Sequence, residues 1–315
     1  MLDFFPSWLS TPSPLSNISY LELFEPLLYL LTSERRIFFG YLAVTGLITA
    51  LLFIQRGQSI KNGVRFLFSR QLWLHPSVLL DFKLVLINHW IWILLITPLL
   101  TSQVAIAIQT NRALKSLLGR GDFFDTNLLA ISIFYTVVIF IIDDFSRFYV
   151  HRLYHRSPLL WRFHAVHHSA TLLTPFTLYR MHIVEMFINA CRSLVVFGVI
   201  GGVFIYLVDG KISEVHILGA SIFSLLFNLA GANLRHSHIW LGWGKLERII
   251  LSPAQHQIHH SAKREHFDKN FGVMIALWDR WFNSWVPSKG QSVTGFGIGS
   301  KEVKQTLKQH VLGIN

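Results

Sequence analysis

Long stretches without charge constrain the fold of this 315-residue chain more than any other feature. Asp, Glu, Lys and Arg are absent from residues 37–55, 84–111, 126–142, 193–208 and 215–234. A helix of about 20 apolar residues crosses the hydrocarbon core of a bilayer, and within lipid it satisfies its own backbone hydrogen bonds. Only 14% of the residues are charged, whereas about a quarter are charged in soluble domains. The sequence therefore predicts an all-α, polytopic membrane protein with about five transmembrane helices.

Two of these stretches depart from the usual length of a span. Residues 84–111 would extend for about 42 Å as a single helix, so we expect a tilt or a kink, with the break at Pro98. Residues 193–208 are few for a span. That helix would begin near Ile183 if Arg192 faces protein or extends its charged end to the interface.

The distribution of positive charge predicts the orientation of the helices. The net charge of +11 comes from basic residues between the apolar stretches, which indicates membrane topology rather than binding of nucleic acid. Residues 55–83, 143–192 and 235–315 contain five, six and eleven basic residues against one, three and five acidic ones. Positively charged loops stay in the cytoplasm. We therefore expect these three segments to form a helical cap on the cytoplasmic face, with the N-terminus outside.

The chain divides into four parts. Residues 1–36 are predicted to be a leader with an interfacial helix around residues 20–31, and residues 37–142 a transmembrane region. Residues 143–287 are expected to form a catalytic region that includes a transmembrane hairpin, with Pro158 and Pro175 at helix boundaries. Residues 288–315 contain several glycines and are predicted to be a loose C-terminal tail.

Three tight histidine clusters stand out in this apolar sequence: HRLYH at 151–155, HAVHH at 164–168 and HQIHH at 256–260. On a helix, residues at i, i+3 and i+4 share one face, so each cluster presents several imidazoles together. Neutral imidazole suits iron, zinc, copper or nickel. The eight imidazoles exceed the four to six ligands of one ion, which indicates two ions. They are His151, His155, His164, His167, His168, His256, His259 and His260.

Five further residues are candidates for the same site. His236 follows the last uncharged stretch, and His182 shares a helical face with Glu185, whose carboxylate could orient its ring. Asp144 lies two and three turns before the first cluster, where it either supports the site or pairs with Arg147. His238 points away from His236 on a helix and stays in doubt. The other histidines, at 75, 89, 216, 266 and 310, are interpreted as interfacial, packing or surface residues.

The order of these motifs resembles a known family. HRLYH, HAVHH, YRMHIVE, RHSHIW, SPAQHQIHHS, DKNFG and LWDRWF, over about residues 143–287, are similar to the fatty acid hydroxylase and sterol desaturase superfamily of membrane di-iron oxidases. The alkylglycerol monooxygenase branch and its bacterial relatives resemble it most. The resemblance implies that the eight clustered histidines and His236 are metal ligands, with His182 either a ligand or a direct neighbour of one.

The resemblance also implies a reaction and its cofactors. We expect two iron ions, for which zinc can substitute on purification, and O2 as co-substrate. The chain has no haem-binding domain, flavin motif or dinucleotide fingerprint, so electrons would come from a separate electron-transfer protein or a diffusible reductant such as a reduced pterin. The substrate would be a membrane lipid, hydroxylated in a fatty acyl, alkylglycerol, sterol-like or headgroup part. The bacterial cytoplasmic membrane is the favoured location over the endoplasmic reticulum.

Three alternatives remain at this point. A lipid desaturase would use the same ligand set. A metal transporter would need ionisable ligands inside the spans, where only His89 and His216 fall. A zinc hydrolase needs three protein ligands, fewer than the chain offers. Cys191 is the only cysteine, which excludes a cysteine-based metal centre.

Overall fold

The computed structural model describes residues 25–298, except 34, 122, 124–127 and 209–217, together with residues 312–313. Within these residues the chain is helical, and its only extended pairs are two isolated bridges, Ile250 with Ile275 and Ser261 with Phe296. The prediction of an all-α fold is confirmed for this part of the chain.

The helices follow one another closely along the sequence. The longer ones are α3 (Phe39–Gln55), α4 (Ile60–Leu67), α6 (Pro76–Ile91), α8 (Ser102–Leu118), α9 (Leu128–Arg156), α10 (Pro158–His168), α11 (Ile183–Leu207) and α12 (Leu218–Leu229). The shorter ones are α2 (Glu25–Leu28), α5 (Arg70–Trp73), η4 (Trp92–Ile96), α7 (Thr97–Leu100), η5 (Pro175–Tyr179), η7 (Ala232–His236), η8 (Gly244–Arg248), α13 (Pro253–His259), η9 (Arg264–His266) and α14 (Leu277–Trp281). Pro158 and Pro175 begin α10 and η5, as predicted.

Three helical stretches in the described residues are long and apolar enough to cross a membrane: Pro76–Leu118, Leu129–Arg156 and Ile183–Leu207. Among the other two predicted spans, residues 37–55 form the 17-residue helix α3, and residues 215–234 contain the 12-residue helix α12. The five-span topology therefore stays a prediction. Large apolar side chains on the long helices are exposed, including Val104, Leu129 and Ile133. Lipid chains would cover such a surface.

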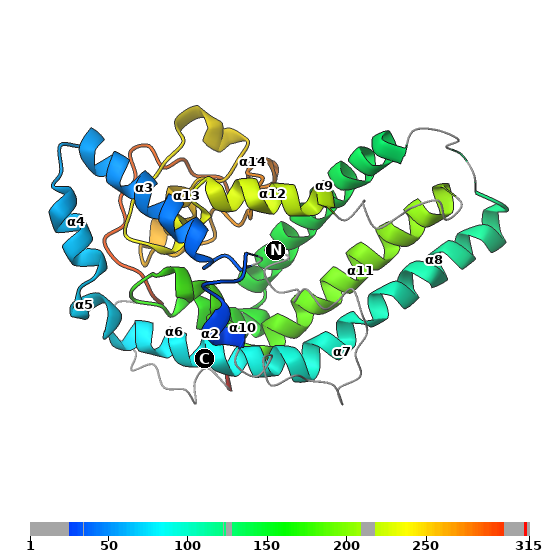
Figure 1. Cartoon of the computed structure of the whole chain (residues 1–315), viewed down its shortest axis with the longest axis horizontal. Helices are drawn as coiled ribbons and strands as arrows, with labels where there is room; N and C mark the ends of the chain where they lie inside the picture. Colours follow the sequence, from blue (N-terminus) through cyan, green and yellow to red (C-terminus); the bar gives the residue numbers. More distant parts are fainter. Residues whose placement is uncertain are drawn as a thin grey trace.

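The first long stretch bends in the middle, and Figure 1 shows α6 and α8 running in different directions on either side of α7. Pro98 lacks an N–H group, and its ring would clash with the carbonyl four residues earlier. The turn before it, Trp92–Ile96, is a π-helix, and such turns are a common cause of kinks. The kink predicted at Pro98 thus begins at the π-helical turn immediately before it.

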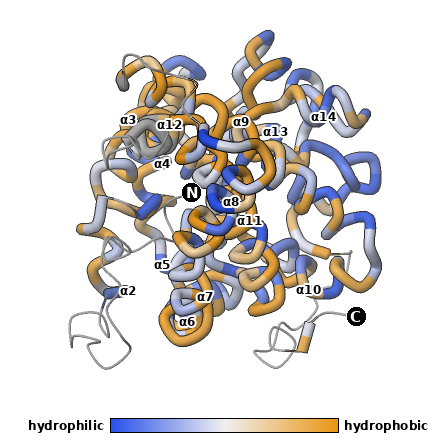
Figure 2. Tube along the Cα trace, turned by 90° about the vertical axis from the view of Figure 1, so that its right-hand side faces the viewer, coloured by the Kyte–Doolittle hydropathy of each residue, from blue (hydrophilic) through white to orange (hydrophobic). Residues whose placement is uncertain are grey.

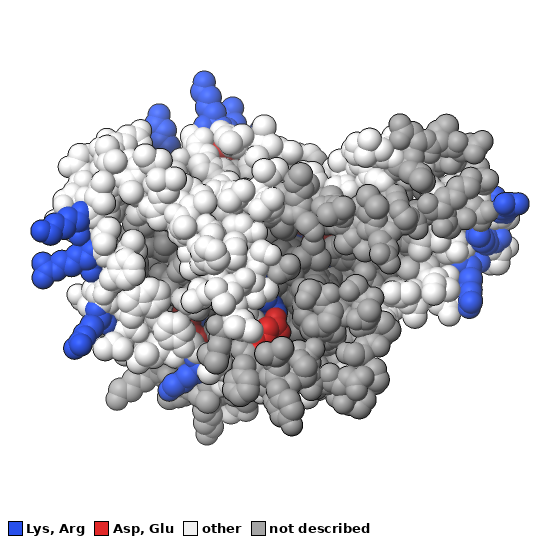
Figure 3. All heavy atoms as spheres, in the orientation of Figure 1, with Lys and Arg blue, Asp and Glu red and all other residues white. Residues whose placement is uncertain are grey.

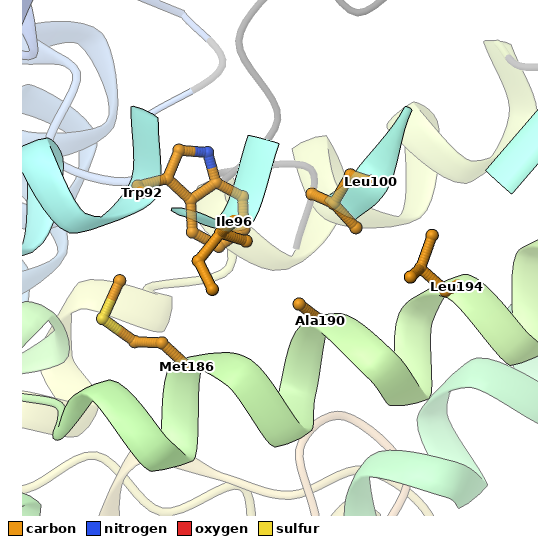
Figure 4. Close-up of a cluster of buried hydrophobic side chains, with 6 residues drawn as sticks. All are labelled: Trp92, Ile96, Leu100, Met186, Ala190 and Leu194. Carbon is orange, nitrogen blue, oxygen red and sulfur yellow. The ribbon is translucent and has the colours of Figure 1, made fainter. Parts of the chain in front are cut away.

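Helices α8, α9 and α11 extend side by side from the rest of the molecule, and we call them the arm (Figure 1). Glycines bring α11 close to α8, because a Cβ atom at Gly202 would lie 2.5 Å from the carbonyl oxygen of Ala107. Near the base of the arm, Trp92, Ile96 and Leu100 face Met186, Ala190 and Leu194 of α11 (Figure 4).

Helix α11 begins earlier than its uncharged stretch, at Ile183. Arg192 faces protein, where its Nη1 lies 2.7 Å from Asp143 Oδ1 and 2.7 Å from Ser146 Oγ. An ion pair with a partner on α9 removes the cost of an isolated charge. The prediction that this helix starts near Ile183 is confirmed.

A buried ion pair joins α6 to the segment before α11. Asp81 Oδ1 accepts a hydrogen bond of 2.6 Å from Arg180 Nε, and Asp81 Oδ2 accepts one of 2.8 Å from Thr177. Arg180 also donates to Ser77 on α6 and to Ser169. The membrane region and the histidine-bearing segments are therefore locked together by polar contacts.

The two terminal segments are described only in part. In the N-terminal one, Glu25–Leu28 is helical, and residues 20–24 of the predicted interfacial helix lie outside the described residues. Tyr29, which follows, is buried, and its hydroxyl lies 2.9 Å from His89 Nδ1, so this segment packs on α6. At the start of the C-terminal one, Ser288 Oγ donates to Glu247 at 2.6 Å.

Hydrophilic stretches gather beside α10 and α14, while the helices of the membrane region are largely hydrophobic (Figure 2). This division separates a polar region, which carries most of the histidines, from the apolar arm.

Candidate metal centre

Four segments deliver the histidine rings. The last turns of α9 and α10 carry the first two clusters, α13 carries the third, and η7 carries His236. Ser157 caps α10 by accepting a hydrogen bond from the backbone of Leu160. Ser252 and Gln255 form a capping box at the start of α13, which fixes where that helix begins. Gln257 donates to the carbonyl of Leu234 at 2.7 Å, so α13 also holds η7.

The histidines converge into two adjacent groups. In each group, one ring nitrogen per residue lies within 4.8 Å of all the others. The five-histidine group contains His151, His155, His164, His168 and His259, and the four-histidine group contains His167, His236, His256 and His260. The rings of His168 and His260 stack across the boundary, with centroids 4.5 Å apart. Nine of the ten predicted ligands are thereby brought together from four separate segments.

The spacing of the inner nitrogens fits a coordinated cation. His151 Nε2 lies 3.1 Å from His164 Nε2, and His256 Nε2 lies 3.1 Å from His236 Nε2 and 3.2 Å from His260 Nε2. Two nitrogens bound at right angles to one ion, each about 2.1 Å from it, would be about 3.0 Å apart. The observed distances match such an arrangement.

Three inner nitrogens are buried without any hydrogen-bond partner: Nε2 of His155, His168 and His259. Leaving a buried polar atom unsatisfied costs about 1–3 kcal/mol. Three such atoms in one place indicate that the site is built for a group that binds lone pairs, and a metal ion is such a group.

The outer nitrogens are held by oxygen atoms. His151 Nδ1 lies 2.7 Å from the carbonyl of Phe271, and His259 Nδ1 lies 2.8 Å from the carbonyl of Lys269. His167 Nδ1 lies 3.2 Å from the carbonyl of Arg180. A carbonyl only accepts, so Nδ1 carries the proton and Nε2 presents its lone pair to the centre.

Two carboxylates also reach ligand rings, both in the five-histidine group. Glu185 Oε1 lies 3.1 Å from His164 Nδ1, and Asp268 Oδ1 lies 3.6 Å from His155 Nδ1. A carboxylate behind an imidazole makes the ring a better electron donor to a metal.

Burial keeps the imidazoles neutral, which is the form that binds metal. Loss of hydration lowers the pKa of His164 to about 3 and the pKa of His167 to about 4. Burial also lowers the pKa of His168, His259 and His260 well below the ordinary value. At neutral pH these rings need not lose a proton before they bind a cation.

His182 lies outside both groups, so its role as a ligand or a neighbour of one stays a prediction. Its Nδ1 accepts a hydrogen bond of 3.1 Å from the backbone of Val184, which caps α11, and its ring packs against Phe163. Glu185 supports the site as expected of a carboxylate there, but it contacts His164 rather than His182.

Asp144 serves the loop after Phe271, while Arg147 Nε donates to Asp143 at 3.1 Å. The carboxylate of Asp144 accepts hydrogen bonds from the backbone of Met274 and Ile275 and from the indole of Trp278. Asp144 therefore fixes the loop after Phe271, whose carbonyl orients His151.

The remaining described histidines serve packing and capping. His238 lies between the rings of Phe66 and Phe296, outside both groups. His75 caps α6, and His266 Nε2 lies 3.1 Å from Gln291 Oε1. The histidines at 216 and 310 fall outside the described residues.

Four supporting residues were not singled out from the sequence: Asp268, Lys269, Phe271 and Asp279. Asp279 accepts hydrogen bonds from the backbone of Phe271 and Gly272, and burial raises its pKa to about 6. The motifs DKNFG and LWDRWF contain all four. They were used only to recognise a family, although backbone carbonyls next to a histidine box could have been considered as partners for its rings.

Comparison with known proteins identifies the region around this site. Residues 136–284 match the family model described as fatty acid hydroxylase. The chain is 26% identical to alkylglycerol monooxygenase of Danio rerio over 162 residues, which are 51% of this chain and 33% of the relative. It is 27% identical to ornithine lipid hydroxylase OlsE of Rhizobium tropici over 176 residues, or 56% of this chain and 49% of the relative.

The matches are partial. They span between a third and a half of the length of these two curated relatives, and no solved structure matches the chain. The family match covers all nine grouped histidines, and the predicted superfamily is confirmed. Residues 136–284, which hold all nine grouped histidines, therefore form a region that matches the fatty acid hydroxylase family.

Proposed function

We propose that this protein is an integral-membrane lipid hydroxylase that holds two iron ions and uses O2 with an external reductant. The observation that carries this proposal is the pair of histidine groups with inner nitrogens at coordination spacing and without other partners. Two relatives, an alkylglycerol monooxygenase and an ornithine lipid hydroxylase, support a lipid as substrate.

The histidine groups and the carbonyls around them would contribute to this reaction in different ways. The five-histidine and four-histidine groups would each hold one ion and leave positions open in a six-coordinate arrangement. Bound iron would supply the activation of O2 that oxidation of a C–H bond needs. The carbonyls of Phe271, Lys269 and Arg180 keep the rings oriented, and burial of the site excludes water.

The position of the site relative to the arm supports access from the membrane. Helix α9 contains a candidate span and ends in the first histidine pair, so the metal centre lies at one end of the arm (Figure 1). The basic residues of α8 lie in its last turns. Figure 3 shows Lys and Arg side chains at the right end, the top and the left edge of the molecule. We propose five spans and a cytoplasmic centre, from the charge distribution argued above.

Comparative lipidomics tests the proposed function. Cells that express the protein should contain a lipid with one additional oxygen, and the label should come from 18O2 rather than from labelled water. Changing His259 and His260 together to Ala should abolish this product, while His238→Ala should retain it.

Two other results would contradict the proposal. A product that has lost two hydrogens and gained no oxygen would identify a desaturase. A product that carries oxygen from water would identify a hydrolase.

A further inference from the structure

Arg235 is a buried cation in direct contact with the four-histidine group. It precedes His236 in η7 and has only 3% of its surface exposed. Its guanidinium donates to the carbonyls of Val273 at 2.6 Å and Gly272 at 3.2 Å, and its Nη2 donates to His256 Nδ1 at 3.2 Å. These contacts hold the guanidinium against the ring of His256, a predicted ligand.

The hydrogen bond at Nδ1 of His256 has the opposite direction to those at Nδ1 of the other predicted ligands. A guanidinium has no acceptor, so Nδ1 of His256 must accept. In the neutral ring the proton then lies on Nε2, the nitrogen that faces His236 and His260, so this nitrogen presents no free lone pair to a metal ion. The outer nitrogens of His151, His167 and His259 face carbonyl oxygens instead. An acceptor behind an imidazole strengthens the ring as a metal ligand, whereas a positively charged donor withdraws electron density from it.

Charge divides the two groups in the same way. The five-histidine group is contacted by the carboxylates of Glu185 and Asp268, and the four-histidine group by Arg235. The carboxylates of Asp144 and Asp279 bind the N–H groups of the loop whose carbonyls Arg235 holds, and they attract the guanidinium at longer range. The charges in direct contact with the rings therefore favour a cation in the first group and disfavour one in the second.

We infer that Arg235 is a positioning residue that makes the two metal positions unequal, with the four-histidine group binding its ion more weakly. The inference rests on the proposed two-metal function. It assigns to a single side chain the order in which the site fills: the five-histidine group first and the four-histidine group second.

The experiment is a titration of the full-length, metal-stripped protein with Co2+, followed by its visible absorption. The wild type should bind two ions in separate steps, the second at least about tenfold weaker, within the range over which outer partners of ligands alter metal affinity. His168→Ala should remove the tighter step and His260→Ala the weaker one, which assigns each step to a group.

Variants at Arg235 separate its charge from its shape. Arg235→Gln removes the charge and keeps a donor, so the weaker step should tighten by about tenfold or more. Arg235→Lys keeps the charge and should retain the wild-type gap. Arg280→Gln removes an exposed arginine and should alter neither step. Thermal melting of the metal-free variants checks that each one is folded.

Each other outcome has a definite meaning. The inference would be overturned if the wild type bound both ions with equal affinity. It would also be overturned if the difference in affinity between the two steps were unchanged in folded Arg235→Gln. Either result would leave the two-metal function intact. If Arg235→Lys lost this difference in affinity to the same extent as Arg235→Gln, the inference would also be overturned, because the shape of the side chain rather than its charge would then be responsible. Binding of fewer than two ions by the wild type would overturn the proposed function and this inference with it.

Discussion

The arm and the metal centre are stabilised in contrasting ways. In the arm, α8 and α11 approach through Gly198 and Gly202, and the cluster at its base consists of apolar side chains. In the centre, nearly every contact is polar and directional: carbonyls hold imidazoles, and Asp144 and Asp279 hold the loop that supplies one of those carbonyls. The arm depends on close packing at its glycines and apolar side chains, and the centre depends on hydrogen bonds between specific atoms. Substitutions of similar size should therefore have different consequences in the two regions.

Removal of a ligand should have the largest effect on the centre. His168→Ala deletes a ring whose inner nitrogen is buried and has no partner, so lipid oxidation should fall more than about 100-fold, beyond the range typical of outer partners. Product yield and bound metal per chain measure this effect. His238→Ala, a histidine outside both groups, should stay within about twofold; an equal loss there would remove the distinction.

Acidification should weaken the metal-free centre before it affects the arm. The pKa of His164 is lowered to about 3 and that of His167 to about 4, against about 6.5 in an unfolded chain. The folded state thus excludes protons that the unfolded state binds, and stability present above pH 6.5 is lost as the pH falls toward 4. Each such ring contributes about 1.4 kcal/mol per pH unit. The melting temperature should fall little between pH 7.5 and 6 and more between pH 6 and 5, and a constant value would contradict the buried, neutral site.

Breaking the polar link between the two regions should be the next most costly change. Arg180→Met leaves Asp81 buried without its cationic partner, and loss of one partner of a buried pair costs about 3–5 kcal/mol. Denaturation of the purified protein measures the loss. Lys263→Gln breaks an exposed pair and should cost less than about 1 kcal/mol. Similar costs for both variants would mean that the buried pair does not connect the regions.

Packing in the arm should tolerate a methyl group at one glycine and not at its neighbour. A Cβ at Gly202 would meet the backbone of Ala107 at 2.5 Å, whereas a Cβ at Gly201 meets nothing nearer than 3.9 Å. Gly202→Ala should cost about 1–3 kcal/mol by overpacking, and Gly201→Ala should be close to neutral. Metal content should be unchanged in both, since the arm and the centre are stabilised separately. Indistinguishable melting curves would show that α8 and α11 do not pack as described.

The smallest effect is expected at a residue that supports a ligand without being one. Glu185→Gln keeps an oxygen near His164 Nδ1 but loses the charge, so metal affinity should fall about tenfold. A competition assay with a chelator measures this change, and Glu265→Gln, on an exposed carboxylate, is the matched control. Unchanged affinity in Glu185→Gln would mean that the carboxylate does not tune the ligand.

Sequence patterns were most informative where the period of a helix fixes a face. The spacing within HAVHH and HQIHH was enough to predict shared faces, and η7 brings in His236 through a contact from Gln257. The start of α11 near Ile183 was predicted because residues 193–208 are few for a span. These inferences depend on local geometry alone.

Contacts between distant segments could not be derived in this way. The hydrogen bond by which His182 caps α11 was not predicted, because its position on the face of Glu185 suggested only a shared site. Asp144 contacts residues about 130 positions later in the chain, and the π-helical turn before Pro98 packs against α11. Periodicity carries no information on such tertiary contacts.

X-ray absorption of the iron-loaded protein tests the two-metal centre most directly. We expect two iron ions per chain, each with a first shell dominated by imidazole nitrogen at about 2.1 Å, and a loss of about one ion in both His168→Ala and His260→Ala. A single iron per chain, or a first shell without imidazole, would contradict the account.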